Sequence, residues 1–308
     1  AAAMRSRAEL ERLCSGLPRP PHEWFDAVPG SIGALARPLA PPASEGELAS
    51  KPQFQRVCIF GPYHSCSNAL AQEIQRFHGA AVVNNERAIR GQRPPLWKHR
   101  VHRSRPPLED DMLCVCLTKD PAFWFQSLVR DPAGGTFYDI EPAERGEEGG
   151  LEAGQLLRPV RFDGAEYADA LRLWEATVRS YFDEDIFPPE QSVVVRCEDF
   201  LFDFHGVMRA LGACGLRPLE KSLVADAPLS GPAKWARHEV RGRTDALSFY
   251  AEPANRYAGL GQEQVEWLSR VAPAVCRPLG YVPDAAAAVA SWTCSRPGSG
   301  ARPAGGGR

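Results

Sequence analysis

The chain has 308 residues, of which 44% are hydrophobic and 24% charged, so it can bury the core of one large α/β domain. Its formal net charge of −2 excludes a general electrostatic attraction to nucleic acid or to an anionic membrane surface. No window approaches the ~18 apolar residues that a membrane-spanning helix requires. We therefore expect neither a nucleic-acid partner nor a membrane span in this chain.

The two ends of the chain show no sustained hydrophobic period. Residues 1–50 are rich in Pro, Ala and Arg, and we interpret them as a loosely packed arm. Residues 285–308 end in a run of Gly, Pro and Arg that is too poor in apolar residues to fold, so we expect a disordered tail. A single domain is predicted between them, over residues 51–284.

Apolar runs alternate with amphipathic helical patterns through this domain. Continuous apolar runs predict strands at residues 56–60, 80–84, 112–117 and 192–197. Helical spacing follows the first strand, Pro121 suits the first turn of a helix after the third, and residues 167–182 predict a helix before the fourth. This alternation is typical of a parallel sheet flanked by helices on both faces, a three-layer α/β sandwich. Residues 133–164, rich in Gly and Glu, are interpreted as a long loop.

The chain contains nine cysteines, and four of them lie inside apolar strand-like runs: Cys58, Cys114, Cys116 and Cys197. We interpret these four as buried thiols that pack like small apolar side chains. Cys114 and Cys116 form a C-x-C pair, whose side chains would share one face of a strand. No second Cys/His pair at zinc-like spacing accompanies them, so we expect no metal site.

The sequence GPYHSCSNAL, residues 61–70, lies between the first strand and the first helix of the domain. A sharp turn of this kind gathers backbone N–H groups at the positive end of a helix, where they can bind an anion. The triphosphate-binding motif G-x-x-x-x-G-K-[ST] would need Gly, Lys and Ser/Thr where this chain has Cys66, Ser67 and Asn68. Triphosphate hydrolysis is therefore disfavoured, and a phosphate bound without a metal is preferred. A capped turn that binds no ligand is the structural alternative.

This turn resembles that of the sulfotransferase family, which runs G-x-x-[KR]-S-G-[ST]-[TN]. Four positions match, namely Gly61, Ser65, Ser67 and Asn68. His64 stands where the family has Lys or Arg, and Cys66 where it has Gly; a histidine can donate to the same oxygens, but its charge depends on pH. The resemblance implies a P-loop-type fold that binds the sulfuryl donor 3′-phosphoadenylyl sulfate. The donor residues at the turn would be His64, Ser65, Cys66, Ser67 and Asn68.

A second stretch, CLTKDPAFWFQS, closes the third strand and opens its helix. In sulfotransferases the equivalent place holds an Arg and a Ser, eight residues apart, that bind the 3′-phosphate of the donor. Here Lys119 and Ser127 are eight apart, with Asp120 and Pro121 after the cation, and a lysine keeps the attraction without the bidentate grip of a guanidinium. The structural alternative makes Asp120 a helix N-cap and Ser127 a surface residue. Stretches that end in E-D and L-G-Y extend the resemblance to about residues 55–283.

The segment PLWKHRVHRS, between the second and third strands, contains the candidate catalytic residues. Sulfuryl transfer needs a base that takes the proton of the acceptor hydroxyl. The resemblance implies a His or Glu base in this region, often as K-x-H, and the candidates are Lys98, His99 and His102, with His99 preferred. Strict K-x-H spacing would need a histidine where the chain has Arg100. A surface-exposed basic loop is the structural alternative.

The sequence thus leads us to expect an enzyme that moves a sulfuryl group from 3′-phosphoadenylyl sulfate to a hydroxyl, on a carbohydrate or a small molecule, without a metal. The alternative is a catalytically silent protein of the same fold that binds adenosine bisphosphate or a glycan, because both donor-site cations and the turn glycine are substituted. A nucleotide kinase would share the fold but conflicts with the missing lysine and Mg²⁺ ligand.

Three further features stay open at the level of the sequence. A basic loop at residues 231–243, which contains Trp235, could hold an anionic saccharide or the donor's 3′-phosphate, or form a solvated charged face. The oligomeric state has no sequence signal. The chain begins at Ala1, so both the cytoplasm and, with an anchor missing from this chain, the Golgi lumen are open.

Overall fold

The structure is a computed structural model that describes much of the predicted domain. The described residues are 54–84, 95–130, 140–142, 153–202, 204–217, 249–250, 253–276, 279 and 281. The predicted arm, the predicted tail and the basic loop at residues 231–243 lie outside the described residues. These three interpretations therefore stay predictions.

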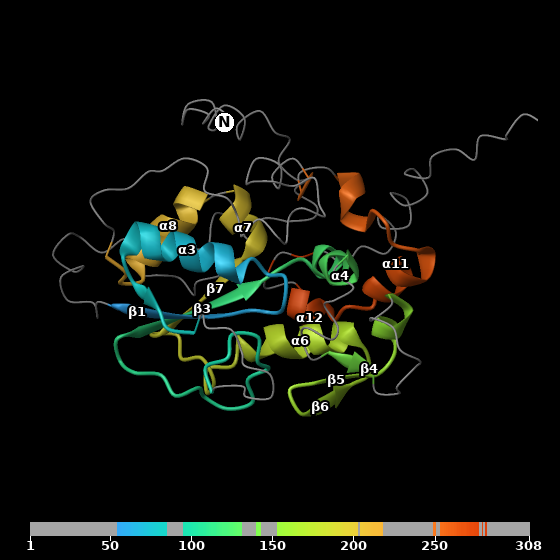
Figure 1. The fold of residues 1–308 in the computed structure, drawn as a ribbon, viewed down its shortest axis with the longest axis horizontal. Coiled ribbons are helices and arrows are strands. Elements are labelled where there is room, and N and C mark those ends of the chain that lie inside the picture. The colour runs from blue at the N-terminus through green and yellow to red at the C-terminus, as the bar shows by residue number, and fades with distance from the viewer. Residues whose placement is uncertain are drawn as a thin grey trace, which may run out of the picture.

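A four-stranded parallel sheet forms the centre of the fold (Figure 1). In the order in which they lie side by side, its strands are β2 (Ala81–Val82), β1 (Arg56–Phe60), β3 (Met112–Thr118) and β7 (Ser192–Arg196). All three neighbouring pairs are parallel. Every residue of β3 is buried, as expected for an apolar strand covered on both faces. The predicted α/β fold with a parallel sheet is confirmed.

Helices cover both faces of the sheet. Alternate residues of a strand point to opposite faces, so each strand contributes side chains to two cores. Val57 and Ile59 of β1 face one core. The helices that contribute to this core are α3 (Ser67–His78), α7 (Cys197–Phe202) and α8 (Phe204–Ala213). Cys58 and Phe60 face a larger core shared with α6 (Ala170–Ser180). Figure 1 shows α3, α7 and α8 above the sheet and α6 below it.

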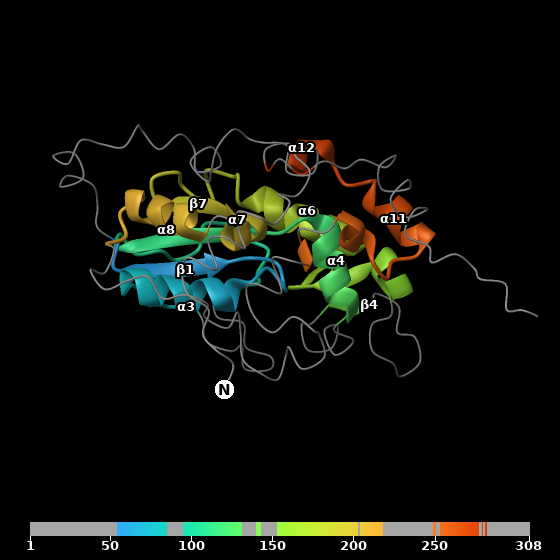
Figure 2. The same cartoon turned by 90° about the horizontal axis from the view of Figure 1, so that it is seen from above.

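The helical stripe predicted for α6 is confirmed, since its four residues are buried: Leu171, Trp174, Val178 and Tyr181. Further helical elements are α4 (Pro121–Arg130), the 3₁₀ helix η3 (Pro253–Tyr257), α11 (Gln262–Leu268) and α12 (Pro273–Cys276); η3 and α11 pack on α4, and α12 packs on α6. Figures 1 and 2 both place α4 and α11 beyond the carboxyl ends of the strands. The rings of Phe125 and Trp267 join α4 to α11, with 4.7 Å between their centroids. Among the described residues, no helix has the length and apolar character to cross a membrane.

Part of the predicted long loop folds into a small antiparallel sheet. Its strands are β4 (Glu141–Pro142), β5 (Val160–Phe162) and, just after the predicted loop, β6 (Ala165–Tyr167); the 3₁₀ helix η2 (Ala153–Leu157) precedes β5. Asp163 and Gly164 join β5 to β6 with φ angles of 48° and 74°, as in a two-residue hairpin turn. The loop prediction was wrong for these residues, because an Asp-Gly turn lets Val160 and Phe162 reach the core within a Gly/Glu-rich stretch.

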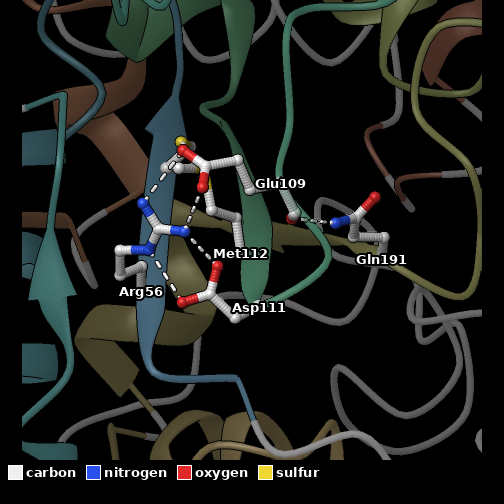
Figure 3. A network of polar contacts seen from close by, with 6 residues as sticks. Arg56, Glu109, Asp111, Met112 and Gln191 are labelled. Atoms are coloured by element: carbon white, nitrogen blue, oxygen red, sulfur yellow. Dashed lines mark hydrogen bonds and ion pairs between the residues drawn. The ribbon is translucent and has the colours of Figure 1, made fainter.

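A polar network ties the amino ends of three strands together (Figure 3). At the start of β1, Nε of Arg56 donates to Oδ2 of Asp111 at 2.8 Å, and Nη2 donates to Oε2 of Glu109 at 2.8 Å. Just before β7, Nε2 of Gln191 donates to the carbonyl oxygen of Glu109 at 2.6 Å. These contacts secure the end of the sheet that lies away from the predicted site.

Candidate functional site

The carboxyl ends of β1 and β3 form the place where this topology favours a ligand. The chain runs from β1 to β2 on one side of it, and then crosses to β3 on the other side. Ligands of open parallel sheets bind in the crevice that such a reversal leaves beyond the strand ends. The turn at residues 61–66 leaves β1 there, Lys119 and Asp120 follow β3, and Cys197 follows β7.

The segment that carries Lys98 and His99 is hydrogen-bonded to the first residue of the turn. The N–H of Gly61 donates to the carbonyl oxygen of Lys98 at 2.9 Å, and Nδ1 of His99 lies 2.7 Å from the carbonyl oxygen of Gly61. Nζ of Lys98 also donates to Oδ1 of Asn68 in the first turn of α3. The structure thus brings two of the three predicted catalytic residues to the predicted donor turn.

Gly61→Ala should destabilise the protein. A Cβ at this position would lie 2.4 Å from Oγ of Ser65 and 3.0 Å from Cβ of Leu117, and both residues are buried. Rotation of the Ser65 side chain can relieve the first contact, but Cβ and the carbonyl oxygen of Leu117, at 3.0 and 3.3 Å, can move away only with β3, and overpacking of this kind typically costs about 1–3 kcal/mol. Denaturant unfolding measures the loss. The control is Gly154→Ala, where no described atom lies within 4 Å of the added Cβ; equal stability of the two variants would contradict the expectation.

Two residues of the turn have a left-handed backbone conformation. The φ angles are 60° at His64 and 63° at Cys66. Cys66 immediately precedes α3 and stands at the position where the sulfotransferase motif has Gly. A left-handed conformation favours glycine, and a residue with a Cβ is strained there by about 1–2 kcal/mol. Leu70 is the first residue of α3 whose N–H bonds back, to the carbonyl oxygen of Cys66 at 3.0 Å. The N–H groups before it lie at the positive end of the helix and lack intrahelical partners.

Buried hydroxyls lie at the carboxyl ends of both strands. Ser65 is 1% exposed and Thr118 is fully buried, and within the described residues neither hydroxyl oxygen has a hydrogen-bond partner. Buried polar groups without a partner are rare in folded proteins and mark places where a ligand or water completes the bonding. Ser67 is buried as well, whereas Asn68 is exposed at the rim of the turn. These hydroxyls and the helix N-terminus together fit an anion.

Lys119 and Ser127, predicted from their spacing to act as one unit, are in direct contact. Nζ of Lys119 donates to Oγ of Ser127 at 2.8 Å and to the carbonyl oxygen of His64 at 3.3 Å. Ser127 is half-buried, so it lies partly at the surface as the structural alternative expected, but its hydroxyl is hydrogen-bonded to Lys119 and to the carbonyl oxygen of Phe123. The contact with His64 connects this pair to the turn after β1. Six of the seven predicted donor residues thus lie in the turn after β1, at the start of α3, or in the Lys119–Ser127 pair that contacts this turn, and Asn68 is exposed beside them.

Lys119 is a buried cation beneath an aromatic ring. Its side chain is 2% exposed, and its Nζ lies 5.1 Å from the ring centroid of Tyr250. Burial lowers the pKa of Lys119, but Tyr250 and the neighbouring thiols of Cys66 and Cys197 raise this pKa by more, so the ammonium form is kept near neutral pH. Among the described residues, no carboxylate oxygen lies within 4.0 Å of Nζ of Lys119, so this cation forms no ion pair there. A bound anion would supply the missing opposite charge.

His99 lies at the wall of a small internal pocket. A carbonyl oxygen only accepts hydrogen bonds, so Nδ1 of His99, which faces the oxygen of Gly61, carries the proton, and Nε2 is the basic nitrogen of the neutral ring. The ring stacks on Tyr63 with 3.9 Å between centroids. The pocket is otherwise mostly apolar and aromatic, and it is lined by Pro62, Tyr63, His99, Trp124, Ile140, Phe162, Leu173, Trp174 and Thr177.

His102 occupies a different environment from His99. Its ring packs edge-on against Phe60 and Phe187, with centroid distances of 4.5 and 5.1 Å. Burial, together with the charge of Arg100, lowers the pKa of His102 to about 4. It is therefore neutral near pH 7 and is held by apolar rings, and the pocket beside the turn is lined by His99 instead.

A buried polar network beneath Lys119 was not predicted as part of the site. Asp120 caps α4, as the structural alternative expected, by accepting from the N–H of Ala122 at 2.9 Å, and it forms an ion pair with Arg256 at 2.7 Å. Glu198 accepts from the N–H of Asp120 at 2.9 Å and from the hydroxyl of Tyr281 at 2.8 Å. Burial, and secondarily the charge of Asp120, raises the pKa of Glu198 to about 7. Three sequence features of this group, the E-D pair after β7, Asp120 as a helix N-cap and the L-G-Y stretch that ends at Tyr281, had been noted but not assigned to the site.

Comparisons with known proteins identify no relative: no family model, no curated protein and no solved structure matches the chain. Within the residues that the structure describes, no group of three or more His, Cys, Asp or Glu side chains could hold a metal ion. Function must therefore be argued from the site itself.

Proposed function

We propose that this chain has a P-loop-type fold and transfers a sulfuryl group from 3′-phosphoadenylyl sulfate to a hydroxyl, with a carbohydrate as the preferred acceptor class. The observation that carries the proposal is the contact between Lys119 and Ser127. The resemblance to sulfotransferases requires a cation and a serine, eight residues apart, to act as one phosphate site. A buried lysine that bridges this serine and the turn after β1 suits that role.

The residues present fit the donor in two places. Lys119 and Ser127 would hold the 3′-phosphate, because a buried cation and a hydroxyl offer charge-assisted hydrogen bonds to its oxygens. The first N–H groups of α3 and the hydroxyls of Ser65 and Ser67 would hold the phosphosulfate. His64 would take the place of the family's Lys or Arg there, with a charge that varies near neutral pH.

The pocket beside the turn holds about 10 Å³, room for about one water, and the rings of Trp124 and Trp174 in its wall are buried. The acceptor would therefore bind outside it, with only the hydroxyl that reacts reaching toward His99. Nε2 of His99 would take the proton of the acceptor hydroxyl as its oxygen bonds to sulfur. The bond from sulfur to the bridging oxygen of the donor breaks in the same step, and adenosine 3′,5′-bisphosphate leaves. Lys98, hydrogen-bonded to Asn68, would place a positive charge beside the turn.

A titration with adenosine 3′,5′-bisphosphate tests the donor site. Lys119→Met keeps the length of the buried side chain but removes its charge, a contact worth roughly 1.5–3 kcal/mol, so the bisphosphate should bind about 10- to 150-fold more weakly. Adenosine 5′-phosphosulfate lacks the 3′-phosphate and is the matched ligand control; its affinity should change little. Absence of bisphosphate binding to the unmutated chain, or equal losses for both ligands, would contradict the assignment.

The catalytically silent alternative is favoured by the substitutions at His64 and Cys66. It makes a different prediction for turnover. Radiolabelled donor offered with a panel of glycans should give labelled product if the chain is an enzyme. Binding of the bisphosphate without transfer to any acceptor would support the alternative.

A further inference from the structure

Two cysteines from distant parts of the chain meet at the predicted anion site. Cys66 precedes α3, and Cys197 begins α7 directly after β7. Sγ of Cys197 donates to the carbonyl oxygen of Ser65, the residue next to Cys66, at 2.7 Å, so the thiol of Cys197 lies against the turn beside Cys66. The two cysteine side chains also interact electrostatically.

The two thiols differ in accessibility and in charge environment. Cys66 is partly exposed, lies at the positive end of the twelve-residue helix α3, and interacts electrostatically with the ammonium of Lys119. A helix N-terminus and a nearby cation both favour the thiolate, which is the nucleophilic form of cysteine. Cys197 is fully buried, and burial raises its pKa well above the ordinary value, so it stays a thiol. The geometry therefore gives Cys66 the role of the attacking sulfur and Cys197 that of its partner.

The other described cysteines lack this combination. Cys58, Cys114 and Cys116 lie on one face of the sheet in the larger core, as predicted for the C-x-C pair, and burial raises the pKa of each thiol. They pack as small apolar side chains. They provide an internal comparison for the reactivity of Cys66.

We propose that Cys66 and Cys197 form a peroxide-sensitive dithiol that modifies the turn after β1. The Cys66 thiolate attacks one oxygen of hydrogen peroxide, the O–O bond breaks, and the leaving hydroxide takes up a proton to become water, leaving a sulfenic acid. The Cys197 sulfur then displaces the hydroxyl of that sulfenic acid, the S–S bond forms, and the Cys197 proton departs with the hydroxyl as a second water. Two thiols and one peroxide thus give one disulfide and two waters.

The disulfide would change the turn itself. It removes the thiol proton that Cys197 donates to Ser65. It also ties Cys66, whose backbone is left-handed, to the end of β7. The bond forms or fails to form whether or not the site binds a sulfuryl donor, so this inference is independent of the proposed function.

Peptide mapping after oxidation tests the dithiol. The reduced full-length chain, freed of reductant, is treated with one to a few equivalents of hydrogen peroxide, and the remaining thiols are alkylated in denaturant. We expect a linked peptide pair that contains Cys66 and Cys197, and a loss of two alkylatable thiols per chain relative to the reduced protein. Cys66→Gly, which suits the left-handed backbone and so should fold, must abolish both signals. Cys214→Ser, which removes another partly exposed cysteine, must leave them unchanged.

A second variant separates the two sulfurs. In Cys197→Ser the sulfenic acid of Cys66 should persist and react with dimedone, with a mass shift on the Cys66 peptide alone. Should this variant fail to fold, the Cys66→Gly comparison still decides the matter. Unchanged thiol content after oxidation of the unmutated chain, or the same loss of two thiols in Cys66→Gly, would overturn the inference.

Discussion

His99→Ala should lower turnover by about 10²–10⁴-fold while the affinity for the donor product stays nearly unchanged. The reason is that Nδ1 of His99 donates to the carbonyl oxygen of Gly61, which makes Nε2 the basic nitrogen of a ring that lines the pocket. A base acts in its neutral form, so turnover of the unmutated chain should rise with pH across the interval of about 5–8 in which histidine side chains lose their proton. Steady-state rates with saturating donor, measured over this interval, check both statements.

Loss of the imidazole also removes the hydrogen bond to Gly61 and the stacking on Tyr63, so a matched variant is needed. His99→Asn keeps a donor near the position of Nδ1 but has no basic nitrogen, and it should be as inactive as His99→Ala while retaining donor binding. His102→Phe fills a space already bounded by Phe60 and Phe187, and it should leave turnover nearly intact. Near-normal turnover in His99→Asn, or a greater loss in His102→Phe, would assign the base elsewhere.

The local patterns of this sequence were sufficient to predict the sheet. The buried strands β1, β3 and β7 are continuous apolar runs, and parallel strands covered on both faces leave that signature. The contact between Lys119 and Ser127 also follows from spacing, because one residue precedes α4 and the other lies about two turns into it, on the same side. These features depend on residues close together in the chain.

The parts that sequence reasoning missed depend on distant residues. Tyr250 covers Lys119, and Arg256 pairs with Asp120, yet neither follows a recognisable motif, since each is positioned by the packing of η3 and its neighbours on α4. The left-handed conformation of Cys66 was not predicted either, because glycine is the usual sequence signal for a positive φ and the chain has a cysteine at this position. The hairpin at Asp163 and Gly164 did carry a local signal, the Asp-Gly pair.

The partnership of Cys66 and Cys197 shows the same limit at the candidate site. Sequence periodicity predicted correctly that Cys197 is buried, although it placed the residue in the strand and the structure makes it the first residue of α7. It could not show that the end of β7 meets the turn after β1, since β3 lies between these strands in the sheet. Contacts across an intervening strand depend on how far each loop extends beyond the strand ends, and no local pattern encodes that distance.

Glu198 should make the stability of the fold depend on pH. Its pKa is raised by burial from an ordinary 4.5 to about 7 in the folded chain, where its carboxyl contacts the N–H of Asp120 and the hydroxyl of Tyr281. Between these two pH values the unfolded chain has released a proton that the folded chain retains. The free energy of unfolding should therefore fall as pH rises from about 4.5 to about 7, by about 3 kcal/mol from this group, and should lose no more from it at higher pH.

Glu198→Gln tests this assignment, because the amide imitates the protonated carboxyl: its oxygen can accept from Asp120 and its nitrogen can donate to Tyr281. Urea unfolding of both proteins at several pH values between 4.5 and 7.5 isolates the group, since all other titrations cancel in the difference. The free energy of unfolding of the unmutated chain should fall relative to that of Glu198→Gln as pH rises. Glu190→Gln, a control at an exposed position, should show the same pH dependence as the unmutated chain. Parallel curves for Glu198→Gln and the unmutated chain would refute the assignment. A confirmed slope would mean that Glu198, which contacts the N–H of Asp120 next to Lys119, becomes negatively charged near neutral pH. This charge would weaken the binding of any anion at the site at higher pH.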